Sequence, residues 1–513
     1  MHLAEAGSIA TLLEVGQDEA IAIGAPEGVT PLRYRGLRAL AQRTVESLNS
    51  LGVGRNDRVA IVLPNGPEMA AAFVTIAAGA TTAPLNPAYR ADEFEFYLTD
   101  LKAKALIVEA GSQSPAKEVA QKLGVPLIEL LPQREEGAGT FTLKPMAGKR
   151  ASAPARLGMG GGEDAALVLH TSGTTSRPKI VPLLQRNVLA TARHIVQTLK
   201  LVPGDVCLNI MPLFHIHGLM AATLASLGAG AQVWCSPGFN ALKFFAWLDE
   251  VKPTWYTAVP TMHQAILARA VRNQEIVARS KLRFIRSSSS SLPPQVMAEL
   301  EKTFNAPVLE SYGMTEASHQ MASNPLPPLP RKPGSVGIAA GPEISIMDEQ
   351  GNLRPHGEIG EVVIKGPNVT SGYEGNPEAN ATAFTGGWFR TGDQGVIDDE
   401  GYLRLTGRLK ELINRGGEKI SPLEVDTVLM DHPAVQQCVT FAVPHDKLGE
   451  EVAAAVVLRE GMTCTERELR EFAEKKLADY KVPRKIVFVA EIPKGATGKL
   501  TRIGLAEKLG LGK

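Results

Sequence analysis

The sequence predicts an α/β fold with a large N-terminal domain and a smaller α+β C-terminal domain. From Asp57 onward, short β-rich runs alternate with helical ones, which is typical of βαβ units and of a parallel sheet flanked by helices. From about Lys332 the segments become β-rich and are punctuated by glycine, which favours a small antiparallel β subdomain. Beyond Lys410 a separate stretch mixes helices and strands. We therefore expect two domains, residues 1–409 and residues 410–513.

The alternating pattern also assigns individual elements of the N-terminal domain. The most apolar long run, Met69 to Leu85, is predicted to form a buried helix followed by a strand. Helices are expected over residues 217–227 and from Pro260 to about Val271. Residues 131–164, which are rich in Gly, Pro, Arg and Ala, are interpreted as an exposed connection. Because parallel strands end at one edge of a sheet, the loops after them can converge on a single site.

The composition favours small-molecule chemistry in a reducing compartment. The chain has 54 Lys plus Arg and 54 Asp plus Glu, and this balance argues against a nucleic-acid or membrane-surface role driven by charge. The four cysteines form no Cys-x-x-Cys pair, so neither a disulfide framework nor a zinc site is indicated. The sequence shows no signal peptide or membrane span, and we expect a cytoplasmic protein. It does not indicate an oligomeric state.

The stretch LVLHTSGTTSRPK, from Leu167 to Lys179, is the strongest candidate for a binding loop. An apolar strand precedes a run of small and hydroxylated residues, which offers backbone N–H groups, hydroxyls and two cations to an anion. It lacks the Gly-x-x-x-x-Gly-Lys-Ser/Thr spacing of the common mononucleotide loop. Standing alone, such a run would be a Ser/Thr-rich surface turn, but four stretches downstream favour a binding role.

The first of these stretches, ESYGMTE, combines an aromatic ring, a hydroxyl and a carboxylate at short spacing. Tyr312 can stack on a purine, and Thr315 can donate to a phosphate. Glu316 can hold Mg²⁺, which prefers oxygen ligands. A satisfied turn without a ligand is the alternative for this motif taken alone.

Three more stretches complete the set. GWFRTGD ends in Asp393, whose carboxylate can accept hydrogen bonds from both hydroxyls of a ribose, and Arg408 follows as a second ribose or phosphate contact. Gly416 and Gly417 permit positive φ angles or close backbone approach to a ligand. PKGATGK carries Lys499 on a Gly/Thr-rich loop. Taken singly, these would be ordinary turns and a solvated lysine.

In this order the five stretches resemble the acyl-adenylate-forming enzymes, which include acyl-CoA synthetases, firefly luciferase and the adenylation domains of peptide synthetases. The resemblance covers essentially the whole chain from Asp57 to the end. It departs from the family pattern at Ile180, where glycine is common, and at Ser287 to Ser291, which replaces the usual Ser-Gly-Gly-Ala-Pro. The second departure borders the acyl pocket of the family.

The resemblance implies an ATP-dependent ligase with two half-reactions. A carboxylate attacks the α-phosphorus of Mg·ATP, pyrophosphate leaves, and the thiol of coenzyme A then displaces AMP. Between the steps the C-terminal domain is expected to be mobile and to swing about Lys410. The swing would withdraw Lys499 and bring forward Gly416 and Gly417 as the lining of the CoA tunnel. The implied cofactors and co-substrates are therefore ATP, Mg²⁺ and coenzyme A.

The same resemblance assigns residues to catalysis and to the nucleotide. Lys499 is expected to neutralise the attacking carboxylate and the α-phosphate. The other implied catalytic residues are His215, Thr315 and Glu316, with Glu316 as the metal ligand. The residues expected to bind ATP and AMP are Thr171, Ser172, Gly173, Thr174, Thr175, Lys179, Glu310, Ser311, Tyr312, Thr315, Asp393, Arg408 and Lys499.

His215 and His217 lie two residues apart beyond a predicted strand. An extended backbone would direct both side chains to the same side. By resemblance, the first gates the entries for ATP and CoA, and the second lines the acyl pocket. A two-histidine metal site and packed core histidines are the alternatives.

Within the family, the closest resemblance is to the oxalate-CoA ligases, through stretches such as PLFHIHGL, LRFIRS and MTEASH. It implies a very small dicarboxylic acid bound by His217, Ser289 and His319. A nearby dianion is expected to favour histidines protonated at both nitrogens. Malonate, glycolate and acetate stay open as substrates. A carrier-protein loader, a non-catalytic adenylate sensor and a luciferase-like oxygenase are the functional alternatives.

Overall fold

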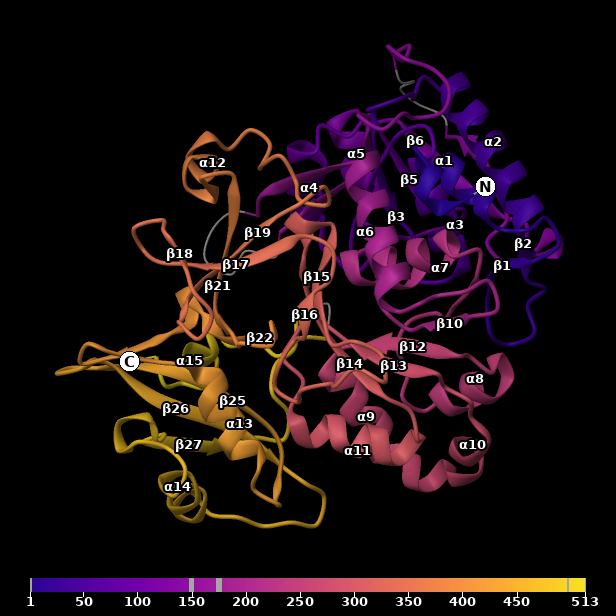
Figure 1. Cartoon of the computed structure of the whole chain (residues 1–513). Coiled ribbons are helices and arrows are strands. Elements are labelled where there is room, and N and C mark those ends of the chain that lie inside the picture. Colours follow the sequence, from indigo (N-terminus) through magenta and orange to yellow (C-terminus); the bar gives the residue numbers. More distant parts are fainter. Residues whose placement is uncertain (1, 147–151, 172–177, 496–497, 513) are drawn as a thin grey trace.

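The structure, a computed structural model, describes residues 2–146, 152–171, 178–495 and 498–512 (Figure 1). Two mainly parallel sheets form most of the N-terminal part, and helices lie between them and against their outer faces. The orange-to-yellow C-terminal part lies beside them and has a sheet of its own. This arrangement confirms the α/β class and the large and small parts expected from the sequence.

The first sheet carries the loop predicted to bind phosphate. Its inner strands run parallel, whereas its two edge strands pair antiparallel with their neighbours. Its strand order is β7 (Phe141–Pro145), β6 (Leu127–Pro132), β5 (Ala105–Glu109), β3 (Arg58–Val62), β4 (Thr81–Pro84), β8 (Ala165–His170) and β9 (Ile180–Leu184).

The second sheet carries the loops that reach the predicted acid pocket. It is also parallel in its centre and antiparallel at its edges. Its strand order is β16 (Ile338–Ala339), β15 (His319–Ser323), β14 (Val308–Met314), β13 (Phe284–Ser287), β12 (Trp255–Ala258), β10 (Val206–Asn209), β11 (Gln232–Cys235), β1 (Ile21–Gly24) and β2 (Leu32–Arg33).

Two helices in the space between the sheets are buried along their whole length. Every side chain of α3 (Pro67–Ala77) and of η4 (His217–Leu224) is buried, as expected for helices that are apolar all round. α3 is followed by β4, which confirms the helix and strand predicted over residues 69–85. η4 is π-helical and continues as α7 (Ala225–Gly228), so the helix predicted over residues 217–227 is confirmed.

The remaining helices of this part have one apolar face, which packs on a sheet or on a neighbouring helix. The longer ones are α2 (Tyr34–Ser50) beside α3, α6 (Gln185–Thr198) between the sheets, α4 (Ala91–Asp100) and α5 (Ala116–Leu123) on the first sheet, and α8 (Phe244–Val251), α9 (Pro260–Ala270), α10 (Gln274–Arg279) and α11 (Pro294–Phe304) on the second. α9 confirms the helix predicted from Pro260.

The prediction that residues 131–164 form an exposed connection is wrong for its first part. β7 pairs antiparallel with β6, and Phe141 at its start is buried. Apolar Phe141 and Leu143 alternate with Thr142 and Lys144, which is the period of a half-buried strand. The Gly- and Pro-rich composition of the neighbouring residues concealed this short alternation.

The antiparallel β subdomain predicted from about Lys332 is confirmed, but its start differs. GSVGIAA forms β16, which pairs with β15 in the second large sheet. Short-range alternation could not show which sheet would receive this segment. The subdomain comprises β18 (Leu353–Arg354), β17 (Glu343–Met347), β19 (Gly360–Lys365), β21 (Trp388–Ile397), β20 (Phe384–Thr385) and β22 (Leu403–Arg408), with α12 (Pro377–Ala383) beside it.

The C-terminal part mixes helices and strands, as predicted. After β22 the chain passes through the short helix η7 (Leu409–Glu411) into another sheet. The domain boundary at Lys410 stays a prediction. The C-terminal elements are β24 (Glu418–Ile420), β23 (Ile413–Arg415), β26 (Gly449–Leu458), β25 (Val435–His445) and β27 (Lys485–Phe488), with α13 (Pro422–Met430), α14 (Glu466–Glu474) and α15 (Leu505–Lys508).

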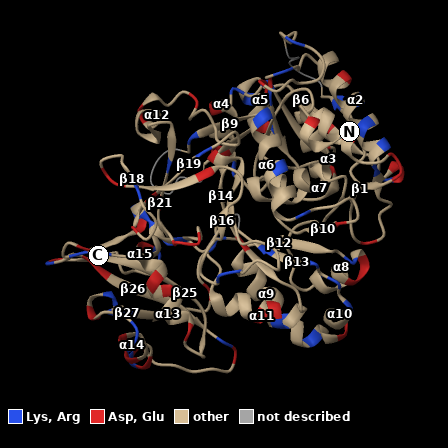
Figure 2. Ribbon diagram, in the orientation of Figure 1, with Lys and Arg blue, Asp and Glu red and all other residues tan. Residues whose placement is uncertain are grey.

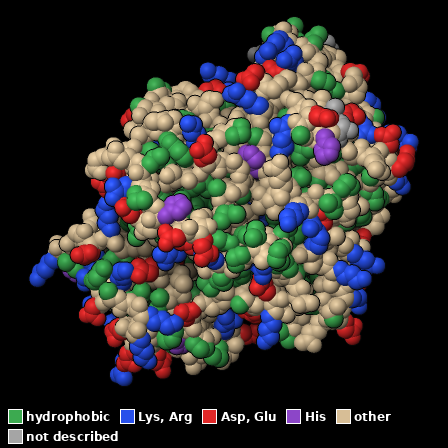
Figure 3. Space-filling model, in the orientation of Figure 1, with side chains coloured by type: hydrophobic (Ala, Val, Ile, Leu, Met, Phe, Trp, Pro, Cys, Tyr) green, Lys and Arg blue, Asp and Glu red, His purple; other side chains and the backbone are tan. Residues whose placement is uncertain are grey.

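Charged side chains of both signs are distributed over the described residues (Figure 2). On the face shown in Figure 3, blue and red side chains are interspersed with tan and green ones. In the part of the chain that the structure describes, no helix combines the length and the apolar character needed to cross a bilayer. The cytoplasmic location expected from the sequence stays a prediction.

A buried carboxylate, Asp164, fixes the entry to β8 and hence to the predicted phosphate loop. Its side chain is 5% exposed, and it accepts hydrogen bonds from Arg55 Nε at 2.7 Å, Asn56 Nδ2 at 2.9 Å and Gly161 N at 2.8 Å. Burial acts to raise the pKa of Asp164, but the hydrogen bonds from Gly161 and Arg55 outweigh it and lower the pKa.

We predict that Asp164→Asn lowers the free energy of unfolding by about 1–3 kcal/mol, because charge-assisted hydrogen bonds are lost at a buried site. The loss should shrink as the pH falls, since a carboxyl group with a lowered pKa stabilises the fold only while it is ionised. The neighbouring Glu163→Gln is the matched control, since the Glu163 side chain is 76% exposed. Urea unfolding of both variants at neutral and acidic pH checks this, and an equal effect of the two would contradict it.

Candidate active site

The loop predicted to bind phosphate joins β8 to β9 as a hairpin. At its ends, Thr171 N donates to Lys179 O at 2.9 Å, and Lys179 N donates to Thr171 Oγ1 at 3.2 Å. The predicted ligands Ser172, Gly173, Thr174 and Thr175 lie outside the described residues. The position of Lys179 therefore fixes where this loop returns to the sheet.

Lys179 and Glu316 both contact Tyr373, an aromatic residue that the sequence did not single out. The ammonium group of Lys179 lies 4.3 Å from the centroid of the Tyr373 ring, and the Tyr373 hydroxyl donates to Glu316 Oε1 at 2.8 Å. Burial raises the pKa of Glu316. Tyr373 lies in the loop between β19 and α12 of the β subdomain, and no local pattern marked it as part of a site.

The residues available for a metal ion fit Mg²⁺ only in company with a phosphate ligand. Among the described residues, no group of three or more His, Cys, Asp and Glu side chains could hold a metal ion. Glu316 offers one buried carboxylate beside the end of the phosphate loop. One carboxylate together with nucleotide phosphates is a usual environment for Mg²⁺.

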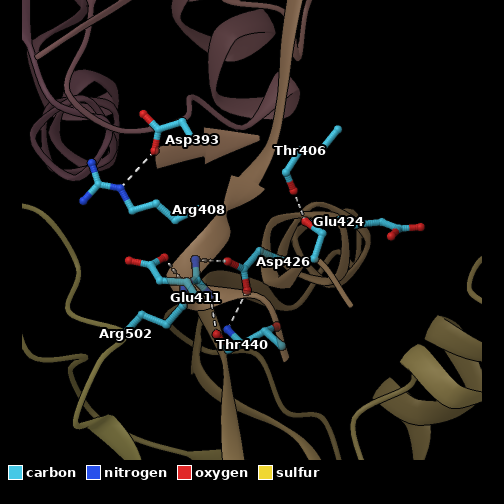
Figure 4. Close-up of polar contacts among 9 residues, drawn as sticks. Asp393, Thr406, Arg408, Glu411, Glu424, Asp426, Thr440 and Arg502 are labelled. Carbon is cyan, nitrogen blue, oxygen red and sulfur yellow. Dashed lines mark hydrogen bonds and ion pairs between the residues drawn. The ribbon is translucent and has the colours of Figure 1, made fainter. Parts of the chain in front are cut away.

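The predicted nucleotide residues Tyr312, Asp393 and Arg408 meet although they are far apart in sequence. The Tyr312 hydroxyl donates to Asp393 Oδ2 at 2.5 Å. Arg408 Nε donates to Asp393 Oδ1 at 3.0 Å, as Figure 4 shows. The charge of Asp393 raises the pKa of Arg408, and burial together with Asp393 raises that of Tyr312. The register between β21 and β22, which pairs Asp393 with Arg408, creates this contact.

The other residues of the ESYGMTE stretch occupy different environments. Glu310 is buried, Leu292 N donates to its Oε1 at 2.8 Å, and its Oε2 has no hydrogen-bond partner among the described residues. Burial raises the pKa of Glu310 to about 8. The Ser311 hydroxyl lies 2.9 Å from the Ser323 hydroxyl of β15. Thr315 begins the short helix η6 (Thr315–Ala317) directly after β14.

The three residues predicted to contact the acid lie together. His217 begins η4, Ser289 follows β13, and His319 begins β15. His217 Nδ1 lies 3.0 Å from Ser289 Oγ, and the two imidazole rings are stacked with centroids 5.1 Å apart. Both histidines are buried. The structure therefore brings these three side chains into one polar cluster, and we call the place where they meet the predicted acid pocket.

Arg286 of β13 completes this pocket and was missed as a site residue. Its guanidinium is fully buried, with Nη1 3.3 Å from His217 Nε2 and Nη2 3.1 Å from His319 Nε2. Within the described residues, Arg286 forms no ion pair with a carboxylate. Burial lowers its pKa to about 9. One signal was available, since Arg286 is a charged residue that directly follows the apolar pair Phe284 and Ile285 of LRFIRS.

Protonation of these histidines at both nitrogens was expected beside a bound dianion, and it stays a prediction for that state. In the ligand-free protein, burial lowers the pKa of His217 and His319 well below the usual value of 6.5, and the positive charge of Arg286 lowers both further. The extended backbone expected from His215 to His217 is wrong. Ile216 has helical torsion angles, and His217 N donates to His215 Nδ1 at 3.3 Å.

Two residues of the pocket adopt backbone conformations that L-amino acids rarely take. Ser289 has φ of +75° and His319 has φ of +109°. A residue in the left-handed region costs roughly 1–2 kcal/mol relative to its ordinary conformation, except at glycine. Such strain is typical of residues whose side chains are needed at a given point.

Lys499 reaches this pocket from the C-terminal part. The Thr261 hydroxyl of α9 donates to Gly498 O at 2.7 Å, which places the lysine against the second sheet. Burial and the charge of Arg408 lower the pKa of Lys499 to about 8. Burial and Lys499 together lower the pKa of His215 to about 3. The two predicted catalytic residues are thus close enough to affect one another.

Gly416 and Gly417 form the turn between β23 and β24, with φ of +60° and +97°. Both are exposed, and Gly416 N donates to Leu448 O within the C-terminal part. In the conformation described here, Lys499 lies at the pocket and these glycines face solvent.

The chain matches two models of one enzyme family. The model described as AMP-binding enzyme matches residues 15–374, and the AMP-binding enzyme C-terminal domain matches residues 424–499. The chain belongs to the AMP-binding enzyme family, as the motifs predicted.

Individual relatives refine this class. The chain is similar to an oxalate-CoA ligase of Arabidopsis thaliana, with 47% identity over 479 residues and 92% of each chain covered. An oxalate-CoA ligase of Saccharomyces cerevisiae is 42% identical, with 95% of this chain and 94% of the relative covered. ATP-bound MatB of Rhodopseudomonas palustris has a TM-score of 0.87 at 30% identity, with 99% of both chains covered, whereas its apo form gives 0.78. The enzyme is an AMP-forming acid–CoA ligase.

We predict that Glu310→Gln stabilises the nucleotide-free protein at alkaline pH. Folding raises the pKa of the Glu310 carboxyl group from 4.5 to about 8, so between these pH values the folded state binds more protons than the unfolded state. The free energy of unfolding of the parent therefore falls as the pH rises through this range. Glutamine resembles the protonated acid and does not titrate. Between pH 5 and pH 9, the stability of the variant relative to the parent should therefore rise by roughly 1–3 kcal/mol. Urea unfolding at both pH values measures this, and a constant difference would contradict it.

Proposed function

We propose that the enzyme activates oxalate, or an acid of similar size with two anionic groups, and transfers it to coenzyme A. The observation that carries this proposal is the buried Arg286 cation, which faces two histidines and has no carboxylate partner among the described residues. An uncompensated buried charge is costly, and a bound anion offsets that cost. A hydrocarbon chain at this place would leave the polar groups without partners.

The positive charges around the predicted acid pocket favour a dianion. Arg286 supplies positive charge at the histidine end, and Lys499 supplies it at the end toward Arg408 and Asp393. The similar chains from Arabidopsis thaliana and Saccharomyces cerevisiae are named oxalate-CoA ligases. Malonate, glycolate and acetate are the alternatives, and loading of a carrier protein is the alternative to thioester formation with CoA.

In the first half-reaction, a carboxylate oxygen attacks the α-phosphorus of ATP and pyrophosphate leaves. We assign Lys499 to neutralise the carboxylate and the phosphate as their charges approach. Tyr312, Asp393 and Arg408 would hold the nucleoside. Mg²⁺ at Glu316 would neutralise phosphate charge when bound. The thiol of CoA then attacks the acyl carbon, and AMP leaves with the bonding electrons of the C–O bond.

The contacts on either side of Lys410 support its proposed role as the pivot. Arg408, just before it, donates to Asp393 of the β subdomain. Glu411, just after it, accepts from Arg502 Nε at 3.2 Å, and Arg502 is held in turn by Asp426 of α13 (Figure 4). Lys410 itself is exposed between these two anchors. Rotation there would carry Gly416 and Gly417 toward the CoA tunnel.

We predict that Lys499→Ala slows adenylation by about a hundredfold or more, since a charge that acts in the transition state is lost. Thioester formation from supplied acyl-adenylate should change only a few-fold. Pyrophosphate exchange measures the first step and AMP release the second. Equal loss in both steps would contradict the proposal.

The pH dependence of adenylation provides a second test of the role of Lys499. Because its pKa is lowered to about 8, kcat/KM for adenylation by the parent should fall as the pH rises above that value and the ammonium loses its proton. Lys499→Arg keeps the cation, so this alkaline decline should be absent in that variant.

We predict that Ser289→Ala and Ser289→Gly each lower kcat/KM for oxalate by about tenfold, because the hydroxyl beside His217 is lost. Glycine relieves the backbone strain at φ of +75° while alanine does not, so Ser289→Gly should be the more stable of the two by about 1 kcal/mol. CoA-dependent AMP release with oxalate, malonate, acetate and hexanoate, together with urea unfolding, tests both points. A parent enzyme that prefers hexanoate would remove the basis for the substrate assignment.

A further inference from the structure

The hydrogen bonds of Arg286 bear on where the protons of the neighbouring imidazole rings lie. A guanidinium group has five N–H donors and no acceptor, and it stays protonated under ordinary conditions. Its Nη1 lies 3.3 Å from His217 Nε2, and its Nη2 lies 3.1 Å from His319 Nε2. Each contact is a hydrogen bond only if the imidazole Nε2 carries no proton and accepts.

The contact with Thr257 is consistent with this direction. Thr257 Oγ1 lies 2.6 Å from His217 Nε2 and 3.5 Å from Arg286 Nη1. When Nε2 is unprotonated, the Thr257 hydroxyl donates to it and can accept from the guanidinium. If His319 instead carried a proton on Nε2, that N–H would face the N–H groups of Arg286 Nη2, 3.1 Å away. A proton on Nε2 of His217 could donate to Thr257 Oγ1, but it would turn an N–H toward Arg286 Nη1 and remove the acceptor of that group. Such an arrangement leaves buried donors unsatisfied.

We propose that Arg286 is a positioning residue that fixes His217 and His319 as neutral imidazoles with the proton on Nδ1. For His217, the Nδ1–H then donates to Ser289 Oγ, 3.0 Å away, and the Ser289 hydroxyl is left to donate its own proton. A chain of donors thus runs from the buried guanidinium through an imidazole to a serine hydroxyl. Each bond in such a chain polarises the next in a low-dielectric site.

The direction of these hydrogen bonds, from Arg286 toward Ser289, affects the choice of substrate. This consequence rests on the function proposed above. A pocket that presents donors matches a carboxylate, since an ionised carboxylate only accepts hydrogen bonds. A methyl group, as in acetate, leaves the same donors without partners. Arg286 would therefore determine selectivity through the histidines and the serine.

The first test measures the tautomers directly in the full-length enzyme without substrate. Long-range proton–nitrogen spectra of ¹⁵N-histidine-labelled protein distinguish protonated from unprotonated ring nitrogens, and His217→Gln and His319→Gln assign the signals. The expected result is an unprotonated Nε2 and a protonated Nδ1 in both residues at neutral pH. Protonation of Nε2 in either histidine of the parent would overturn the proposal.

The second test removes the donor. Arg286→Met has similar length and no charge, and it should shift at least one of the two histidines toward the Nε2–H tautomer. It should also lower kcat/KM for oxalate by about a hundredfold and that for acetate by much less. Unchanged tautomers, or an unchanged ratio between the two acids, would overturn the positioning role.

Two controls separate this role from a merely structural one. Arg283→Met also removes an arginine of the same segment, but Arg283 pairs with Asp205 away from the pocket, so stability should fall while the tautomers stay as in the parent. Thr257→Val is the second variant, for use if Arg286→Met does not fold. It keeps Arg286 and should therefore preserve both tautomers. If the tautomers are as expected but the parent uses acetate as well as oxalate, the inference stands and the substrate assignment falls.

Discussion

The structure of this site depends on one buried positive charge. Arg286 lies at the end of β13 with no exposed surface, and burial disfavours its charged form enough to lower its pKa to about 9. Two imidazole nitrogens and a threonine hydroxyl accept or share its hydrogen bonds. These neutral groups contact its two Nη atoms, its Nε has no hydrogen-bond partner among the described residues, and its charge is left uncompensated, which makes the pocket receptive to a small anion.

The fold creates this arrangement by bringing three segments to one edge of the second sheet. β13 contributes Arg286, the start of η4 contributes His217, and β15 contributes His319. The positive φ angles at Ser289 and His319 show that the backbone is held in an unfavourable conformation at the two places where side chains must turn toward the pocket. The surrounding apolar cores supply the stability that offsets this strain.

The C-terminal part completes the site from the opposite side. The Thr261 hydroxyl of α9 donates to the carbonyl of Gly498, which brings Lys499 close to His215, His217 and His319. The glycine turn of β23 and β24 stays exposed in this conformation.

By itself, the sequence determined the α/β class and the order of the main helices and strands through short-range periodicity, and the enzyme family through motifs of adjacent residues. The same resemblance named His217, Ser289 and His319 as the residues proposed to bind the acid. The pairing of β7 and the sheet that receives β16 depended on long-range hydrogen bonds. Arg286 and Tyr373 became visible as site residues only in the folded chain. Their partners are distant in sequence, and the direction of a histidine hydrogen bond is decided by what lies within about 3 Å of each ring nitrogen.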